Sequence, residues 1–78
     1  MMSAAEIEKG MEALNRTIEW AKKDRELELD MLRREFKLDS EYLNMDTVIA
    51  YANRIKSIDI EIEKAQAKLR LCKEILDE

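Results

Sequence analysis

The stretch that decides the fold is residues 55–76, IKSIDIEIEKAQAKLRLCKEIL. Its apolar members recur at alternating steps of three and four residues: Ile55, Ile58, Ile62, Ala65, Leu69, Cys72 and Leu76. Val48 extends the row toward the N-terminus. This spacing places the side chains along one face of an α-helix and is typical of the seam of a coiled coil. The segment therefore predicts a long amphipathic helix that packs against another helix.

The N-terminal half of the chain carries a matching row. Its apolar members are Ile7, Met11, Leu14, Ile18, Ala21, Leu29, Leu32 and Phe36. Arg25 takes one position in this row, and we expect it either to extend to solvent or to pair with a carboxylate of the partner helix. Ser3 followed by Glu6 forms a capping box, which marks the start of a helix. The first helix is therefore predicted over residues 4–38.

The apolar periodicity lapses over residues 39–45, where residues that favour caps and turns gather: Asp39, Ser40, Asn44 and, just beyond, Asp46. Either Asn44 or Asp46 can cap a second helix over residues 46–76. The 78 residues are thus predicted to form one all-α domain, an antiparallel helical hairpin. One uninterrupted helix of more than about 70 residues is the alternative, and the cap-forming residues favour the hairpin.

Each predicted helix also carries a second apolar row, roughly on the opposite side. These rows contain Ala13, Trp20, Leu27, Met31 and Leu38 in the first helix, and Ile49, Ile60, Ala67, Leu71 and Ile75 in the second. A lone hairpin buries one row of each helix, and large exposed apolar patches mark interfaces. The sequence does not rank the two rows, so they can exchange roles.

A chain this short needs stabilisation beyond its own core. It has one cysteine and no histidine, so an internal disulfide is excluded and a zinc site is not expected. We therefore expect the hairpin to form a homodimer, as a four-helix bundle. The expected second interface consists of Trp20, Leu27, Met31, Ile60, Leu71 and Ile75.

The net charge of −4 is concentrated at the connection, while both helices are nearly balanced. A basic footprint for nucleic acid is lacking, so that partner is not expected. A second candidate contact lies at the acidic tip, with Asp39, Glu41, Tyr42, Asn44 and Asp46. No signal peptide or membrane-spanning run is visible, which predicts a cytoplasmic protein that does not enter membranes.

Enzyme chemistry has little support in this sequence. General acid–base catalysis most often uses histidine, and the chain also lacks a glycine-rich loop for phosphate. Cys72 lies on the seam, where a small buried hydrophobe is expected. We expect no catalytic activity, no cofactor and no metal. The predicted function is a small interaction module (an adaptor, chaperone-like binder or inhibitor) that binds itself, with one other protein as a further candidate partner. A small regulatory protein of a signalling pathway, or a nucleic-acid-associated protein, is the alternative.

The apolar frame of residues 48–58 resembles the small two-helix phosphatases of sporulation signalling. That family carries a Ser-Gln-x-x-Asp motif on its second helix, in which the Asp is needed for activity. The motif would fall here on Ala52, Asn53, Arg54, Ile55 and Lys56. The Ser and Gln are replaced, and Lys56 stands where the Asp would be. The resemblance therefore implies a hairpin architecture and not the activity.

Overall fold

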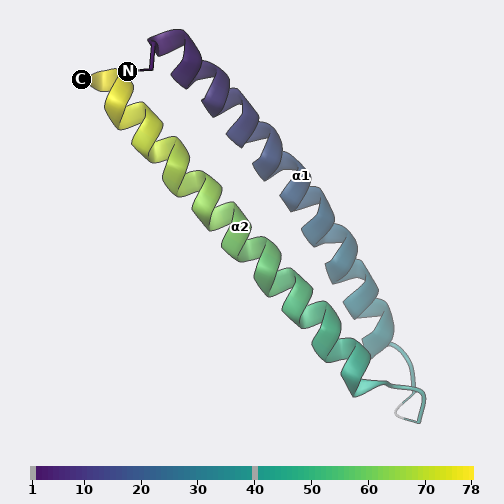
Figure 1. The fold of residues 1–78 in the computed structure, drawn as a ribbon. Coiled ribbons are helices and arrows are strands. Elements are labelled where there is room, and N and C mark those ends of the chain that lie inside the picture. Colours follow the sequence, from purple (N-terminus) through teal and green to yellow (C-terminus); the bar gives the residue numbers. More distant parts are fainter. Residues whose placement is uncertain (1, 40) are drawn as a thin grey trace.

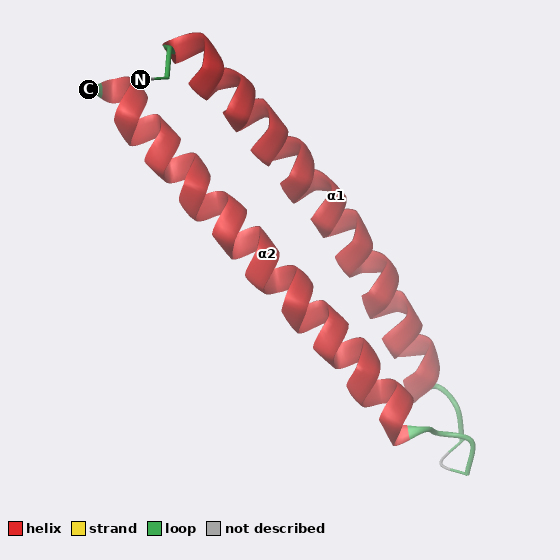
Figure 2. Cartoon of the chain, in the orientation of Figure 1, coloured by secondary structure: helices red, strands yellow, loops and turns green. Residues whose placement is uncertain are grey.

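Two helices of equal length, joined at one end, make up the computed structural model, which describes residues 2–39 and 41–78. Helix α1 spans Ala4–Phe36 and helix α2 spans Met45–Asp77. They run antiparallel, with both termini at one end and the connection at the other (Figure 1). Figure 2 shows that helix accounts for nearly all of the chain. The Cα atoms extend over 59 × 15 × 14 Å, a rod two helices wide. The predicted all-α hairpin is confirmed, and the single uninterrupted helix is excluded.

Helix α1 begins where the sequence places it. The Ser3 hydroxyl oxygen accepts a hydrogen bond from the Glu6 backbone N–H at 3.2 Å, and the hydroxyl donates to Glu6 Oε1 at 3.3 Å. The helix ends at Phe36, two residues before the predicted end. There the backbone N–H groups of Lys37 and Leu38 bond three residues back, to Arg34 and Glu35. Such bonds tighten and end the last turn of a helix.

Helix α2 begins at Met45, one residue before the predicted start, because Asn44 is its cap. The Asn44 side-chain oxygen accepts hydrogen bonds from the backbone N–H groups of Asp46 and Thr47, at 3.0 and 3.2 Å. This satisfies two donors that the first turn of a helix leaves unpaired. The helix ends at Asp77, one residue beyond the predicted end.

Burial between the helices follows the rows that pass through Ile18 and Ala65. In α1, Ile18 and Ala21 are buried, and in α2 the buried residues are Val48, Ala65 and Leu69. A core cluster of Ile18, Ala65 and Leu69 is supported by Met11, Leu14 and Ile62. This cluster lies between the middle of the rod and its terminal end. The two rows identified from periodicity thus form the intramolecular seam.

The seam departs from the predicted row in the last turns of α1. Phe36 was expected inside, but its side chain is 57% exposed, whereas Glu28 and Glu35 are half-buried. The reason is the partner helix: α2 keeps a strict seven-residue repeat from Val48 to Leu76, in which half-buried Tyr51 takes part. To stay in contact, α1 must continue the same repeat, and that repeat reaches residues 28 and 35. Leu29 remains half-buried beside Glu28, whereas Phe36 lies outside the seam.

The two glutamates that enter the seam each find a partner. Glu28 Oε2 lies 3.6 Å from Arg54 Nη1, an ion pair too long to count as a hydrogen bond. Glu35 Oε1 accepts a hydrogen bond from the Asn44 backbone N–H at 3.2 Å. The rod therefore has an apolar seam toward its termini and a mixed seam toward its connection, where the two glutamates lie among buried Val48 and half-buried Leu32 and Tyr51.

Neither helix, over the described residues, contains a stretch long and apolar enough to cross a membrane.

Candidate interaction surface

All six residues predicted for a second interface lie outside the seam with their side chains exposed. Trp20 is 72% exposed and Leu27 65%, and the other four are exposed as well: Met31, Ile60, Leu71 and Ile75. The structure therefore ranks the two sets of rows, which the sequence left open. The rows through Ile18 and Ala65 hold the hairpin together, and the rows through Trp20 and Leu71 remain uncovered.

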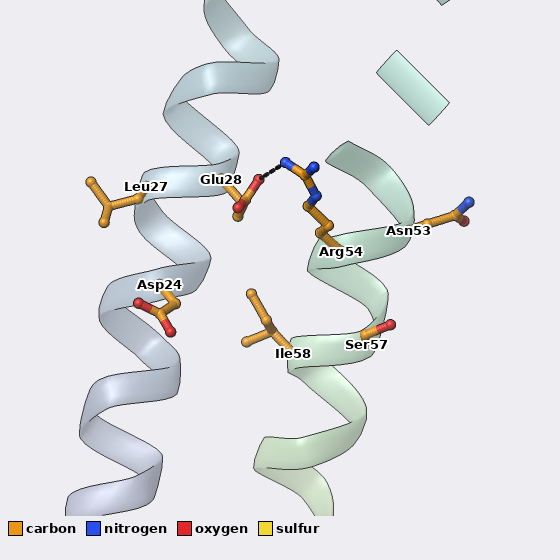
Figure 3. A pocket seen from close by; sticks show the side chains of 7 residues that line it. All are labelled: Asp24, Leu27, Glu28, Asn53, Arg54, Ser57 and Ile58. Carbon is orange, nitrogen blue, oxygen red and sulfur yellow. Dashed lines mark ion pairs between the residues drawn. The ribbon is translucent and has the colours of Figure 1, made fainter. Parts of the chain in front are cut away.

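One open groove shows which parts of the two helices share a face. It is lined from α1 by Asp24 and Leu27 and from α2 by Arg54 and Ser57 (Figure 3). In that view Leu27 points away from α2, while Glu28 points toward Arg54. Asp24 and Leu27 of α1 therefore flank the seam on the same side as Arg54 and Ser57 of α2.

Positions seven residues apart lie on the same face of helices that pack with this repeat. The face defined by the groove therefore continues along both helices, and we call it the Trp20 face. In α1 it contains Glu6, Gly10, Ala13, Thr17, Trp20, Asp24, Leu27, Met31, Arg34 and Leu38. In α2 it contains Thr47, Ala50, Arg54, Ser57, Glu61, Lys64, Lys68, Leu71, Ile75 and Glu78. A second hollow, at the terminal end, brings Glu6, Gly10 and Ile75 together, as this assignment requires.

The angle of this face differs from the sequence-based expectation. At 3.5 residues per turn its two rows lie about 80° and about 130° from the seam. They are therefore a quarter to a third of a turn away, rather than on the opposite side. That direction suits a second layer of helices stacked on the hairpin.

Five of the six predicted residues belong to the Trp20 face, but they do not form one cluster. Trp20 and Leu27 line a common hollow in the middle of α1, and Met31 lies one turn further on. Leu71 and Ile75 lie nearer the termini. Ile60 occupies the side of α2 farthest from the seam, two residues after Ile58, and is not part of this face.

Small residues complete the face, and of these only Ala13 belonged to a predicted apolar row. The surface is shallow beside the large apolar side chains, at the positions of Gly10, Ala13, Thr17 and Ala50. Thr17 and Gly10 lie seven and fourteen residues before Asp24, and Ala13 and Ala50 lie seven residues before Trp20 and Ser57. This seven-residue spacing is the pattern that assigns them to the face. The opposite flank is mostly charged, apart from Phe36, Met45 and Ile49 near the connection, all exposed.

Arg25 forms an ion pair with a carboxylate of the other helix, which is one of the two arrangements expected from the sequence; the other was extension to solvent. Its Nε donates to Asp59 Oδ1 at 2.7 Å, with the two side chains 37% and 44% exposed. The hydrogen bond to Asp59, and then its charge, raises the pKa of the Arg25 guanidinium. A group whose pKa is higher in the folded state than in the unfolded state stabilises the fold at any pH below its unfolded-state pKa. That stabilisation is lost only as the pH rises through the folded-state pKa. This contribution is therefore constant at neutral pH and disappears only in strongly alkaline solution.

The acidic tip has mainly local structural contacts. The Asp39 carbonyl accepts hydrogen bonds from the backbone N–H groups of Tyr42 and Leu43, at 2.8 and 3.0 Å. Asn44 caps α2, and Asp46 lies in its first turn, where a negative charge is favourable. The side chains of Glu41 and Tyr42 are exposed. Ser40, which also belongs to this segment, lies outside the described residues.

Across residues 2–39 and 41–78, no three acidic, cysteine or histidine side chains are grouped so that they could hold a metal ion. Cys72 is a half-buried free thiol on the seam. The main feature of the surface described above is its exposed large apolar side chains.

No protein-family model matches the chain, and neither curated proteins nor solved structures give a significant match. The functional argument therefore starts from the Trp20 face itself.

Proposed function

We propose that this protein is a small, non-enzymatic interaction module that packs protein against its Trp20 face. Its first partner is a second copy of the chain, so that two hairpins form a four-helix bundle. The observation that carries the proposal is the exposure of Trp20 and Leu27, at 72% and 65%, on one flank of a narrow rod. Contiguous exposed apolar surface on a small soluble protein marks an interaction site.

The energetics of the hairpin favour such a partner. Among the described residues only five apolar side chains are buried: Ile18, Ala21, Val48, Ala65 and Leu69. A core of that size supports a folded chain only weakly. Burying one large apolar side chain contributes about 1.5–3 kcal/mol, and tryptophan is enriched among the residues that dominate binding energy. Covering the Trp20 face therefore adds stabilisation that the hairpin alone lacks.

An adaptor, a chaperone-like binder or an inhibitor would use this surface in the same way, by presenting a helix face to a groove of another protein. The proposal includes a cytoplasmic location, supported by the free thiol of Cys72, which suits a reducing compartment.

The test is the solution mass, measured by light scattering behind a sizing column over a series of concentrations. We expect twice the chain mass of 9.2 kDa. The double variant Trp20→Ala/Leu27→Ala should shift the mass to that of one chain. Ile60→Ala is the matched control, because it also removes exposed apolar atoms but from outside the Trp20 face, and it should leave the dimer intact. A wild-type chain that stays monomeric at every concentration would refute self-association.

A further inference from the structure

Resting on the proposed self-association, we infer how the second copy binds. The two hairpins stack antiparallel through their Trp20 faces, about a two-fold axis at Trp20. In this arrangement Met31 of each copy occupies the hollow over Gly10 of the other.

The lengths of the helices favour an axis at Trp20. Trp20 is the central residue of the 33 residues of α1, so an axis at this level brings the ends of the two rods flush. Such an axis stacks α1 on α1 and α2 on α2, and the two copies of Trp20 meet on it. The Cα atoms of the whole rod extend over 59 by 15 Å, so one broad side covers about 900 Å² in projection, close to the roughly 800 Å² per partner of a stable interface.

Large and small residues then meet across the interface. On α1, residues at equal or nearly equal distances from Trp20 face each other. Leu27 and Ala13 are each seven residues from Trp20, and Met31 and Gly10 are eleven and ten residues from it. On α2 the axis passes near Glu63, because Ile18 packs on Ala65 and Arg25 pairs with Asp59. Residues at nearly equal distances from that level include Ile75 and Ala50, again one large side chain opposite a small one.

The open space over Gly10 is the observation that points to Met31 of the other copy as the side chain that fills it. A β-carbon at Gly10 would find no atom of the described chain within 4 Å outside its own helical surroundings, and the backbone there is helical. The hairpin by itself therefore gives no reason for a glycine, which is unfavourable within a helix. The hollow beside it measures about 330 Å³ and is walled by Met2, Ile7, Cys72 and Ile75. Methionine is flexible enough to fill an irregular apolar hollow of this kind.

Charges agree with the antiparallel arrangement. Arg34 of one copy meets Glu6 of the other across the two α1 helices, and Glu61 meets Lys64 across the two α2 helices. A parallel stack would place α1 on α2 at the same level. It would then bring Trp20 against Lys64 and set Asp24 beside Glu61, two like charges. Opposite charges across an interface favour one orientation and disfavour the other.

The first test is steric, and it uses a variant that should fold at least as well as the native chain. Gly10→Leu fills the hollow with a side chain that favours helix, so the dissociation constant of the dimer should rise by tenfold or more without loss of helicity. Adding Met31→Ala should return the dissociation constant to within a few-fold of the native value. An unchanged constant in Gly10→Leu, or no recovery in the double variant, overturns the arrangement.

The second test is a cross-link that leaves Trp20 in place. In a Cys72→Ser background, Ala13→Cys and Leu27→Cys are prepared separately, mixed and oxidised. The mixed sample should form a disulfide-linked heterodimer. Each variant alone should not cross-link, because the two copies of either position lie about 20 Å apart along the rod. Cross-linking within each variant alone, or none in the mixture, contradicts the antiparallel register.

The two proposals fail in different ways. Suppose that Trp20→Ala/Leu27→Ala dissociates the dimer, but Gly10→Leu leaves the dissociation constant unchanged and the mixed cysteine variants do not cross-link. The Trp20 face is then supported as the interaction face, and the antiparallel arrangement is refuted. If the native chain is monomeric throughout, self-association itself fails.

Discussion

At the scale of single residues, two aliphatic side chains of α2 illustrate the difference between the inside and the outside of the hairpin. Leu69 is 9% exposed and packs in the cluster with Ile18 and Ala65, whereas Ile60 is 43% exposed on the side farthest from the seam. Both belong to apolar rows of the same helix. Their contributions to stability should nevertheless differ greatly, because only Leu69 leaves a cavity when it is shortened.

We predict that Leu69→Ala lowers the free energy of unfolding by about 2–3 kcal/mol, at the lower end of the range for leucine in larger cores. Ile60→Ala should change it by less than about 0.5 kcal/mol. Urea unfolding followed by circular dichroism, at one fixed protein concentration, measures both. Similar losses in the two variants would contradict the assignment of the seam.

At the scale of the elements, the helix ends are set by local hydrogen bonds. Ser3 and Asn44 each satisfy backbone donors in the first turn of the helix that follows. Asn44 also donates its backbone N–H to Glu35, so the start of α2 is tied to the last turns of α1. One residue thus fixes where α2 begins and how the connection closes.

We predict that Asn44→Ala lowers the free energy of unfolding by about 1 kcal/mol, the usual value of a helix cap. Asn53→Ala is the matched control: Asn53 is exposed in the body of α2, where alanine favours helix, so it should be neutral or slightly stabilising. The same urea titration compares the two variants. A loss at Asn53 as large as that at Asn44 would argue against the capping role.

At the scale of the whole molecule, the seam is uneven along the rod. The cluster around Ile18 and Leu69 holds the half nearer the termini. Beyond Ala21 at its middle, the described rod has one buried apolar side chain on the side of the connection, Val48. That half also contains Arg25, Glu28 and Glu35. Partly exposed ion pairs contribute little to stability compared with buried apolar surface. The two halves should therefore open with different free energies.

We predict that amide hydrogen exchange is slowest around Ile18, Ala65 and Leu69 and faster over residues 25–36 and 45–56. Because the proposed dimer adds protection along the Trp20 face, exchange should be recorded at several protein concentrations. Uniform rates along both helices at low concentration would contradict an uneven seam.

Sequence reasoning recovered the candidate surface only in part. Trp20, Leu27, Met31, Leu71 and Ile75 could be identified because large apolar residues recur outside the row of a seam. Gly10 and Ala50 were missed because small residues carry little apolar signal of their own. Their meaning depends on the large side chains that would face them.

The sequence by itself determined the two helices, the cap of α1 and the apolar rows of each helix, but not which row packs inward. These features depend on local hydrogen bonds and on the regular recurrence of apolar residues within one helix. Only the tertiary structure decided that Glu28 and Glu35 enter the seam while Phe36 is excluded, and that Asp59 pairs with Arg25. It also decided that the Trp20 rows flank the seam rather than oppose it. The physical reason is that a helix pairs in the register its partner allows, and the strict repeat of α2 overrides the drifting apolar row of α1.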